Sequence, residues 1–365
     1  MFSLITNRVS RFNLTLLATG SATCLAILLT SGTMAIAETP SGPELNYPDS
    51  FVENTAAMME DPAAAVATDD DASLNAKSAA DECAAYHDRC ACCHDYEGGL
   101  CSLIQPSDHC YDDFISPMTN PVFFEDPRNL TEARLIFLNH KVPLTAAGGD
   151  IQLYALQIRA ALSDRLSLIA TKDGYIVSSN PLVDDGWADI SAGLKYLLYS
   201  DPCAQQLASA GVVYELPVGT PDAAQGNGDG TFDVFLSAGS QLCCAGHWIG
   251  AGGFVLPVDD DAESTWCYIS NHFDYELRSG YYALIEFNWF HWLESGANGI
   301  PGIEGGDLFN FGSTGVAGND VVTGAFGLKY KPSSHTELGV AWELPLTERR
   351  DVFENRITVD WIWRY

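Results

Sequence analysis

A cluster of cysteine and histidine residues near the start of the chain has the spacing of a cofactor site. The run Cys90-Ala91-Cys92-Cys93-His94 contains the C-x-x-C-H pattern of covalent haem attachment. In such a site Cys90 and Cys93 form the two thioethers, and His94 is an axial ligand of the iron. Cys92 interrupts the pattern, and other cysteines surround it. A c-type haem is therefore one hypothesis for this segment.

The same segment fits a disulfide framework better. Six cysteines lie between residues 83 and 110, namely Cys83, Cys90, Cys92, Cys93, Cys101 and Cys110. Dense cysteines in an exported chain are typical of disulfides, whose pairing cannot be derived from spacing. His87 and His109 allow a zinc site of thiolates and imidazoles, although the spacing matches no standard ligand arrangement. We expect disulfides and no cofactor, with haem and metal as the alternatives.

Four more cysteines occur later in the chain: Cys203, Cys243, Cys244 and Cys267. Vicinal cysteines rarely bond to each other, because disulfide geometry requires a larger separation of the two backbones. Cys243 and Cys244 could therefore bridge to Cys203 and Cys267 and fasten loops together. Buried thiols without a bridge are the alternative, and the sequence leaves both open.

Two further patterns could support ion binding or catalysis, and both have simpler explanations. Residues 227–233 resemble part of a calcium loop, but Gln225 and Leu236 stand where its first and last ligands are expected. A glycine-rich turn into a strand accounts for this segment. His272 shares a strand face with Ser270, yet the chain has no G-x-S-x-G nucleophile motif. We expect neither an enzyme nor a metal site.

Most of the chain consists of segments in which apolar and polar residues alternate. In one of them Val322, Phe326 and Leu328 share a face, and Thr323 and Lys329 lie on the other. A period of two residues indicates strands rather than helices. The expected strands are 133–140, 151–162, 166–177, 188–199, 207–217, 231–240, 246–256, 264–276, 281–292, 321–330, 335–345 and 355–365.

The length of these strands and the kinds of connection between them predict a membrane barrel. A tilted strand of about 9–11 residues crosses a bilayer, whereas strands in soluble proteins have about 5–6 residues. The connections at 163–165, 259–262 and 331–334 are tight, those at 217–230 and 293–318 are long, and 200–206 is intermediate. Short turns and long loops at opposite ends are typical of outer-membrane barrels. We predict an all-β, antiparallel transmembrane β-barrel of about 12 strands.

The end of the chain supports this prediction. Its last strand alternates and ends on an aromatic residue, with one face formed by Ile357, Val359, Trp361, Trp363 and Tyr365. An edge strand with two exposed tryptophans would be an aggregation hazard in water, but tryptophan and tyrosine are common at membrane interfaces. A terminal strand of this kind resembles the signal that barrel-assembly machinery recognises.

The residues before the barrel predict export and a flexible lead-in. Residues 1–37 have the basic start, apolar core and small residues Ala35 and Ala37 of a cleaved signal peptide. Residues 38–82 form an acidic linker rich in alanine and aspartate, which we expect to be disordered. Residues 83–125 form the cysteine-rich segment and barrel lead-in, and 126–365 form the barrel. The formal charge of −30 argues against nucleic acid as a partner.

The inward face of the strands holds polar and charged residues of both signs. The lumen candidates are Gln157, Arg159, Lys195, Glu215, Asp233, Glu286, Asn288, Lys329, Glu343, Arg356 and Asp360. They could line a water-filled pore, in which Lys195, Glu286 and Lys329 would tune what passes. Alternatively they pair with one another and fill a narrow barrel, because charges away from water need partners.

Several segments resemble a known group of barrels. The runs 161–168, 193–196 and 214–219 occur in this order in outer-membrane transporter-like proteins grouped with the meta-pathway phenol-degradation transporters, and 327–330 and 342–347 look like a second round of the same strand pair. The cysteine-rich insert departs from that pattern. The resemblance implies passive passage of small solutes, including hydrophobic or aromatic compounds, across the outer membrane of a Gram-negative-type envelope.

Two hypotheses about function follow. In the first, the chain is a pore or transporter whose partners are outer-membrane lipid, the barrel-assembly machinery and small-molecule solutes. In the second, the barrel anchors a surface interaction or structural module formed by 83–110, or carries a tethered haem for electron transfer. The second hypothesis predicts a plugged lumen. Oligomeric state cannot be inferred from the sequence.

Overall fold

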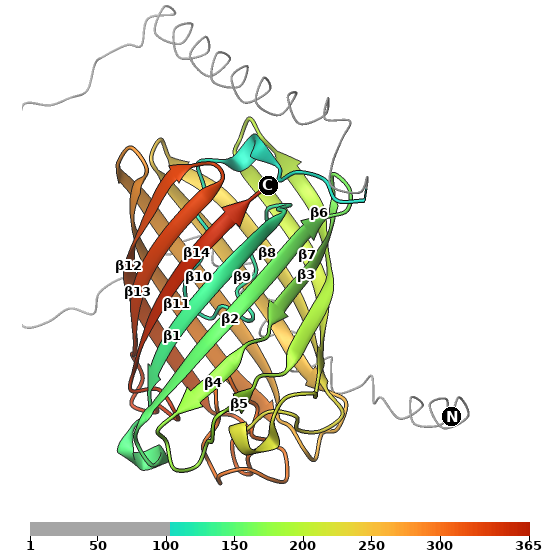
Figure 1. The fold of residues 1–365 in the computed structure, drawn as a ribbon, viewed down its shortest axis with the longest axis vertical. Helices are drawn as coiled ribbons and strands as arrows, with labels where there is room; N and C mark the ends of the chain where they lie inside the picture. The colour runs from blue at the N-terminus through green and yellow to red at the C-terminus, as the bar shows by residue number, and fades with distance from the viewer. Residues whose placement is uncertain (1–102) are drawn as a thin grey trace, which may run out of the picture. The chain divides into compact units, whose positions relative to one another are not determined.

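The computed structural model describes residues 103–365, and these form an antiparallel β-barrel (Figure 1). Its strands are β1 (Glu132–Lys141), β2 (Asp150–Ala161), β3 (Leu166–Lys172), β4 (Tyr175–Ser178), β5 (Gly186–Trp187), β6 (Ile190–Asp201), β7 (Gln206–Leu216), β8 (Thr231–Cys243), β9 (Gly246–Pro257), β10 (Thr265–Arg278), β11 (Tyr281–Glu294), β12 (Asp320–Ser333), β13 (Thr336–Pro345) and β14 (Asn355–Arg364). Three short 3₁₀ turns accompany them: His109–Tyr111, Leu144–Ala146 and Pro221–Ala223. No helix among the described residues is long and apolar enough to cross a membrane.

The barrel closes where its first and last strands meet. Phe137 of β1 lies opposite Val359 of β14 on one side and opposite Tyr154 of β2 on the other. The strands β3 and β4 pair with successive parts of β2 and share one barrel position, and β5 pairs only with β4. Since β6 pairs with β3, the strands β5 and β6 share the next position, and the fourteen strands occupy twelve barrel positions. The predicted fold class is confirmed.

One predicted strand is interrupted. The sequence predicts a continuous strand over 166–177, but in the structure the strand is broken at Asp173 and Gly174, between β3 and β4. Gly174 has a φ of +119°, and a Cβ at this position would lie 2.4 Å from the carbonyl oxygen of Tyr154. The Asp173 carboxylate accepts a hydrogen bond from the backbone N–H of Leu156 at 2.8 Å and so replaces a strand partner. The break is thus stabilised by specific contacts of Asp173 and by the backbone conformation of Gly174.

The outer and inner faces of the strands differ as the alternation predicted. Outward-facing side chains such as Leu194, Phe287 and Trp361 are large, apolar and exposed. Inward-facing neighbours such as Lys195 and Glu286 are buried. An apolar outer surface on a closed barrel without free edges is the arrangement that spans a lipid bilayer.

The two ends of the barrel carry different connections. Tight turns at 162–165, 202–205, 244–245, 279–280 and 334–335 form one end, where β14 and the chain also end (Figure 1). The other end carries the longer loops 217–230, 295–319 and 346–354. The 200–206 connection, judged intermediate from sequence, is a tight turn of the first end, and the tight connection at 259–262 belongs to the second. By the general rule for outer-membrane barrels, the short-turn end faces the periplasm and the long-loop end faces outward.

This orientation can be tested with two cysteines. Cys243 and Cys244 are exposed, free thiols in the tight turn between β8 and β9. We expect a membrane-impermeant maleimide to modify them only after the outer membrane has been permeabilised, as measured by mass spectrometry of the peptide that contains them.

A cysteine introduced by Asp260→Cys at the long-loop end provides the control, because Asp260 is exposed there. It should react in intact cells. Modification of Cys243 and Cys244 in intact cells, with Asp260→Cys protected, would reverse the orientation.

Candidate functional site

The lumen is occupied by the residues that precede the first strand. This inner segment, residues 103–131, enters at the short-turn end, where the Ser107 N–H donates to the carbonyl of Tyr365 at 2.6 Å. It returns to the same end, because the Asp108 N–H donates to the carbonyl of Asn129 at 3.0 Å. Every residue from 114 to 130 is buried. The inner segment is therefore a loop folded into the barrel (Figure 1).

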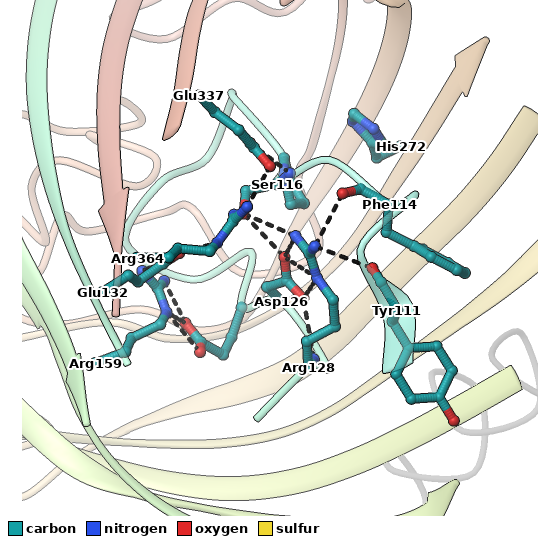
Figure 2. A network of polar contacts seen from close by, with 12 residues as sticks. Tyr111, Phe114, Ser116, Asp126, Arg128, Glu132, Arg159, His272, Glu337 and Arg364 are labelled. Carbon is teal, nitrogen blue, oxygen red and sulfur yellow. Dashed lines mark hydrogen bonds and ion pairs between the residues drawn. The ribbon is translucent and has the colours of Figure 1, made fainter. Parts of the chain in front are cut away.

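Buried charges bind the inner segment to the wall of the barrel. Glu125 lies between Arg159, at 2.6 Å, and Lys195, at 2.7 Å. The Lys195 ammonium also donates to the backbone carbonyls of Asp126 and Arg128, at 2.5 and 2.8 Å. All three of its donors are thus used by the inner segment. Figure 2 shows that Arg128 forms a bidentate ion pair with Asp126. Its guanidinium also donates to the carbonyls of Tyr111 and Phe114.

A second group of charges holds the middle of the inner segment. Lys329 donates to the carbonyl of Ser116 at 2.8 Å and pairs with Glu337 at 3.2 Å and Asp360 at 3.0 Å. The Ser116 N–H donates in turn to Glu337 at 3.1 Å. Arg364 pairs with Glu337 at 2.5 Å and closes the group from the last strand. Each of these charges is buried and has a partner.

Glu286 binds the backbone of the inner segment directly. Its carboxylate accepts hydrogen bonds from the N–H groups of Met118 and Thr119, at 2.7 and 2.6 Å. It also lies 2.6 Å from Nδ1 of His272, whose Nε2 lies 3.1 Å from Asp274. Among the described residues, no hydrogen bond joins His272 to Ser270, which instead accepts one from Asn120. The Ser–His pairing of a hydrolase is not formed there.

All of the predicted lumen residues lie on the inner face. Ten of the eleven are buried, and the side chain of Glu215 is 13% exposed beside Lys172. In the structure most of them contact one another or the inner segment, whereas Glu215 pairs with Lys172 and Asp233 accepts a hydrogen bond from Tyr268. They do not line an open channel. The sequence analysis missed Glu125, Asp126 and Arg128, because the inner segment shows no alternation. Arg364 could have been found, since it alternates with Trp361 and Trp363 on the last strand.

Towards the long-loop end, part of the lumen is apolar. Phe123 of the inner segment packs on Trp266 and Tyr268 of β10, with ring centroids 4.7 and 5.4 Å apart. They belong to a large buried cluster that continues to Phe309 and Phe353 in the loops. A small inner pocket of about 20 Å³ lies in this cluster and is lined mainly by aliphatic side chains and Phe309. This cluster is therefore a packed dry core, and it lies beside the buried ion pairs Lys172–Glu215 and Arg356–Asp307 of the same half of the lumen.

An outer groove of about 840 Å³ lies on the wall where the strand is interrupted. Exposed apolar side chains, including Tyr154, Trp187 and Trp361, line it. Four residues line both this outer groove and the inner pocket, namely Ile136, Ala155, Asp173 and Ala188. Only one layer of side chains therefore lies between the outer groove and the inner pocket.

The long-loop end contains two buried carboxylates with different surroundings. Glu304 accepts four hydrogen bonds, from Ser264 at 2.7 Å and from the backbone N–H groups of Gly305, Phe311 and Ser313. Glu263 is equally buried, yet its Oε2 has no hydrogen-bond partner. Burial first, and then the nearby Glu215, raise the pKa of Glu263 to about 8.

Some of the cysteines in the predictions lie within the described residues 103–365, and others lie outside them. Cys83, Cys90, Cys93, His94 and Cys101 lie outside the described residues, as do the signal peptide and the linker, so the disulfide, haem and zinc hypotheses stay predictions. Cys110 is described and buried. Since Cys243 and Cys244 are free, the bridges from them to Cys203 and Cys267 are not formed.

Comparisons with known proteins return only distant structural likenesses. No family model and no curated protein matches the sequence. An outer-membrane channel from Pseudomonas putida F1 is similar, with a TM-score of 0.47 and 15% identity over 69% of this chain and all of that one. The KdgM porin has a TM-score of 0.39 and 11% identity over 64% of this chain and 99% of that one. The translocator domain of the autotransporter NalP from Neisseria meningitidis has a TM-score of 0.39 and 10% identity over 64% of this chain and 88% of that one. These similar structures are outer-membrane β-barrels, and at such scores their activities do not bear on this chain.

The substitution Lys195→Met should loosen the inner segment. It removes three donors from Glu125 and two backbone carbonyls, and breaking a buried ion pair costs about 3–5 kcal/mol. We expect a lower temperature for loss of heat-modifiable gel mobility and larger single-channel conductance in planar bilayers. Lys141→Met is the control, because Lys141 is exposed at the end of β1. Unchanged conductance and stability in Lys195→Met would show that the inner segment is not held by this contact.

The raised pKa of Glu263 predicts a pH dependence of stability. A carboxyl that titrates near 4.5 when unfolded and near 8 when folded binds its proton more tightly in the folded state. Its contribution to stability therefore falls as the pH rises between these values. The wild type should lose more heat stability between about pH 5 and about pH 9 than Glu263→Gln does. Asp229→Asn, which neutralises an exposed carboxylate, should behave as wild type; equal losses in all three proteins would contradict the assignment.

Proposed function

We propose that the protein is an outer-membrane barrel that passes small apolar solutes through its interrupted wall. The observation that carries the proposal is the sharing of Ile136, Ala155, Asp173 and Ala188 by the outer groove and the inner pocket. A solute dissolved in the bilayer would meet the apolar lumen across these four side chains alone. The resemblance to phenol-degradation transporters supports aromatic compounds as one class of solute.

The character of the lumen supports this route over an axial aqueous one. Burial of apolar surface contributes about 0.8 kcal/mol per methylene group, and the inner pocket is lined by such groups. Polar solutes would have to displace the inner segment, which Lys195, Glu286 and Lys329 bind through charge-assisted hydrogen bonds. In this proposal those residues keep polar solutes out rather than select among them.

The filled lumen also favours a second function. A barrel closed by its own inner segment could act as an anchor that presents residues 83–110 to a partner. The two functions differ in what a change at the wall would do. Blocking the interruption should abolish solute passage but leave an anchored interaction unaffected.

The substitution Ala155→Trp tests the proposed route. Ala155 lines both spaces, so an indole ring there would fill the connection between them. In liposomes that contain the refolded protein, we expect uptake of an apolar aromatic solute to fall at least about tenfold, as when a binding site loses its space for the ligand.

Ala283→Trp is the matched control, because Ala283 lies on β11, whose strand neighbours are β10 and β12 rather than the strands of the interrupted wall. It should fold and pass solute as the wild type does. Undiminished uptake by a folded Ala155→Trp barrel would reject the lateral route. If neither the wild type nor the Lys195→Met protein passes any solute, the anchor function is favoured.

A further inference from the structure

The long-loop end contains a cavity that the proposed route does not use. This cup, of about 530 Å³, is lined by apolar side chains, amides and glycine backbone, including Leu182, Ile300, Phe311, Asn227, Asn298 and Gly228. Only one layer of loop separates it from the dry core: Ala224 and Gly226 line the cup, whereas Gln225 between them lines the inner pocket. The cup is thus placed to receive a solute from outside the cell.

The loops around the cup carry charge of one sign. The connections 179–185, 217–230, 258–264 and 295–319 contain ten Asp or Glu residues and no Lys, Arg or His. Six of these carboxylates are exposed, namely Asp184, Asp185, Asp222, Asp229, Asp260 and Asp261. A surface of this kind attracts cations and repels anions over roughly a Debye length.

Behind the glycine loop lies a carboxylate that lacks a counter-ion. Glu263 is 4% exposed, and its Oε2 has no hydrogen-bond partner among the described residues. A Cβ on Gly228 would lie only 2.9 Å from this oxygen, and Gly228 also lines the cup. Among the described residues, the cation that acts on Glu263 is Lys172, whose ammonium already pairs with Glu215 at 2.7 Å.

We propose that the cup binds the ammonium group of an aromatic or apolar amine, with Glu263 as its counter-ion, and that it disfavours carboxylates. This inference rests on the proposed function, because it names the charge of the solute that the barrel passes. An ammonium would supply the donors that Oε2 lacks, whereas a carboxylate would add a like charge to an uncompensated acidic site. No group of three or more His, Cys, Asp or Glu in the described residues is arranged to hold a metal ion.

Binding should depend on pH in a defined direction. Glu263 faces Glu215, Asp189 and Asp259, and only Lys172 opposes them. Since burial raises its pKa to about 8, the carboxyl is largely protonated at neutral pH and must release its proton to pair with an ammonium. The affinity for an amine that stays charged should therefore rise as the pH rises towards about 8, and this rise should be absent in Glu263→Gln.

The test is calorimetric binding to the full-length mature protein in nanodiscs of zwitterionic lipid. Benzylammonium, benzyl alcohol and benzoate share one ring and differ in charge. We expect benzylammonium to bind at least about tenfold more tightly than benzyl alcohol, as for a hydrogen bond to a charged group, and benzoate to bind most weakly. Glu263→Gln should remove the preference for benzylammonium.

Glu294→Gln serves as the control, because Glu294 is an exposed carboxylate outside the four loops; it should bind as the wild type does. Equal affinities for the three probes would overturn the proposal, as would a preference that survives Glu263→Gln in a folded barrel. Tighter binding of calcium ion than of benzylammonium would also overturn it. Because calorimetry does not measure passage, failure here is distinct from failure of the Ala155→Trp uptake test.

Discussion

The pairing of buried charge inside the barrel is the constraint on which the rest of the structure depends. Period-two strands place Arg159, Lys195 and Lys329 in a lumen that lipid surrounds, and each would be costly without a partner. The wall supplies Glu132 to Arg159 and both Glu337 and Asp360 to Lys329, whereas the three hydrogen-bond partners of Lys195 all belong to the inner segment. The inner segment completes the set with the Glu125 carboxylate and with backbone carbonyls such as that of Ser116. The segment is therefore part of the folded barrel, and its presence excludes an open aqueous channel along the axis.

The parts of the structure that the sequence predicts are those with a side-chain period. Alternation predicts the strands, both faces of the wall and every lumen candidate, because one register assigns all residues of a strand. The inner segment could not be predicted in this way. Lys329 and Glu286 bind it through the Ser116 carbonyl and the Met118 N–H, groups that every residue type could offer. The interruption of the wall did carry a signal, because the outward apolar face switches there from even to odd positions: Leu168 is exposed before the break, and Tyr175 and Val177 are exposed after it. A one-residue shift of this kind moves side chains to the other face, and it marks the break together with Asp173 and Gly174.

The position of the interruption determines which groups an opening of the wall would expose to lipid. On the charged side of the lumen, a gap in the wall would expose ion pairs to lipid. It lies instead beside Ile136, Ala155 and Ala188, in a mainly apolar part of the interior in which the charged pair of Lys172 with Glu215 is already formed. Opening such a wall exposes few groups that need water, and Asp173 already satisfies the N–H that the break leaves without a strand partner. A lateral path is compatible with the membrane there and would be costly elsewhere.

Charge is also distributed unequally along the barrel axis. Lys195, Lys329 and Arg364 lie in the short-turn half, where the inner segment and the wall carboxylates bind them. In the loop half, Lys172 and Arg356 are paired with Glu215 and Asp307. The loops around the cup contain no basic residue, and Glu263 stays buried without a counter-ion. Such a carboxylate lowers stability unless it stays protonated or acquires a partner. A fold that keeps a destabilising group beside a cavity, with only Gly228 between them, is best explained if the partner comes from outside the chain.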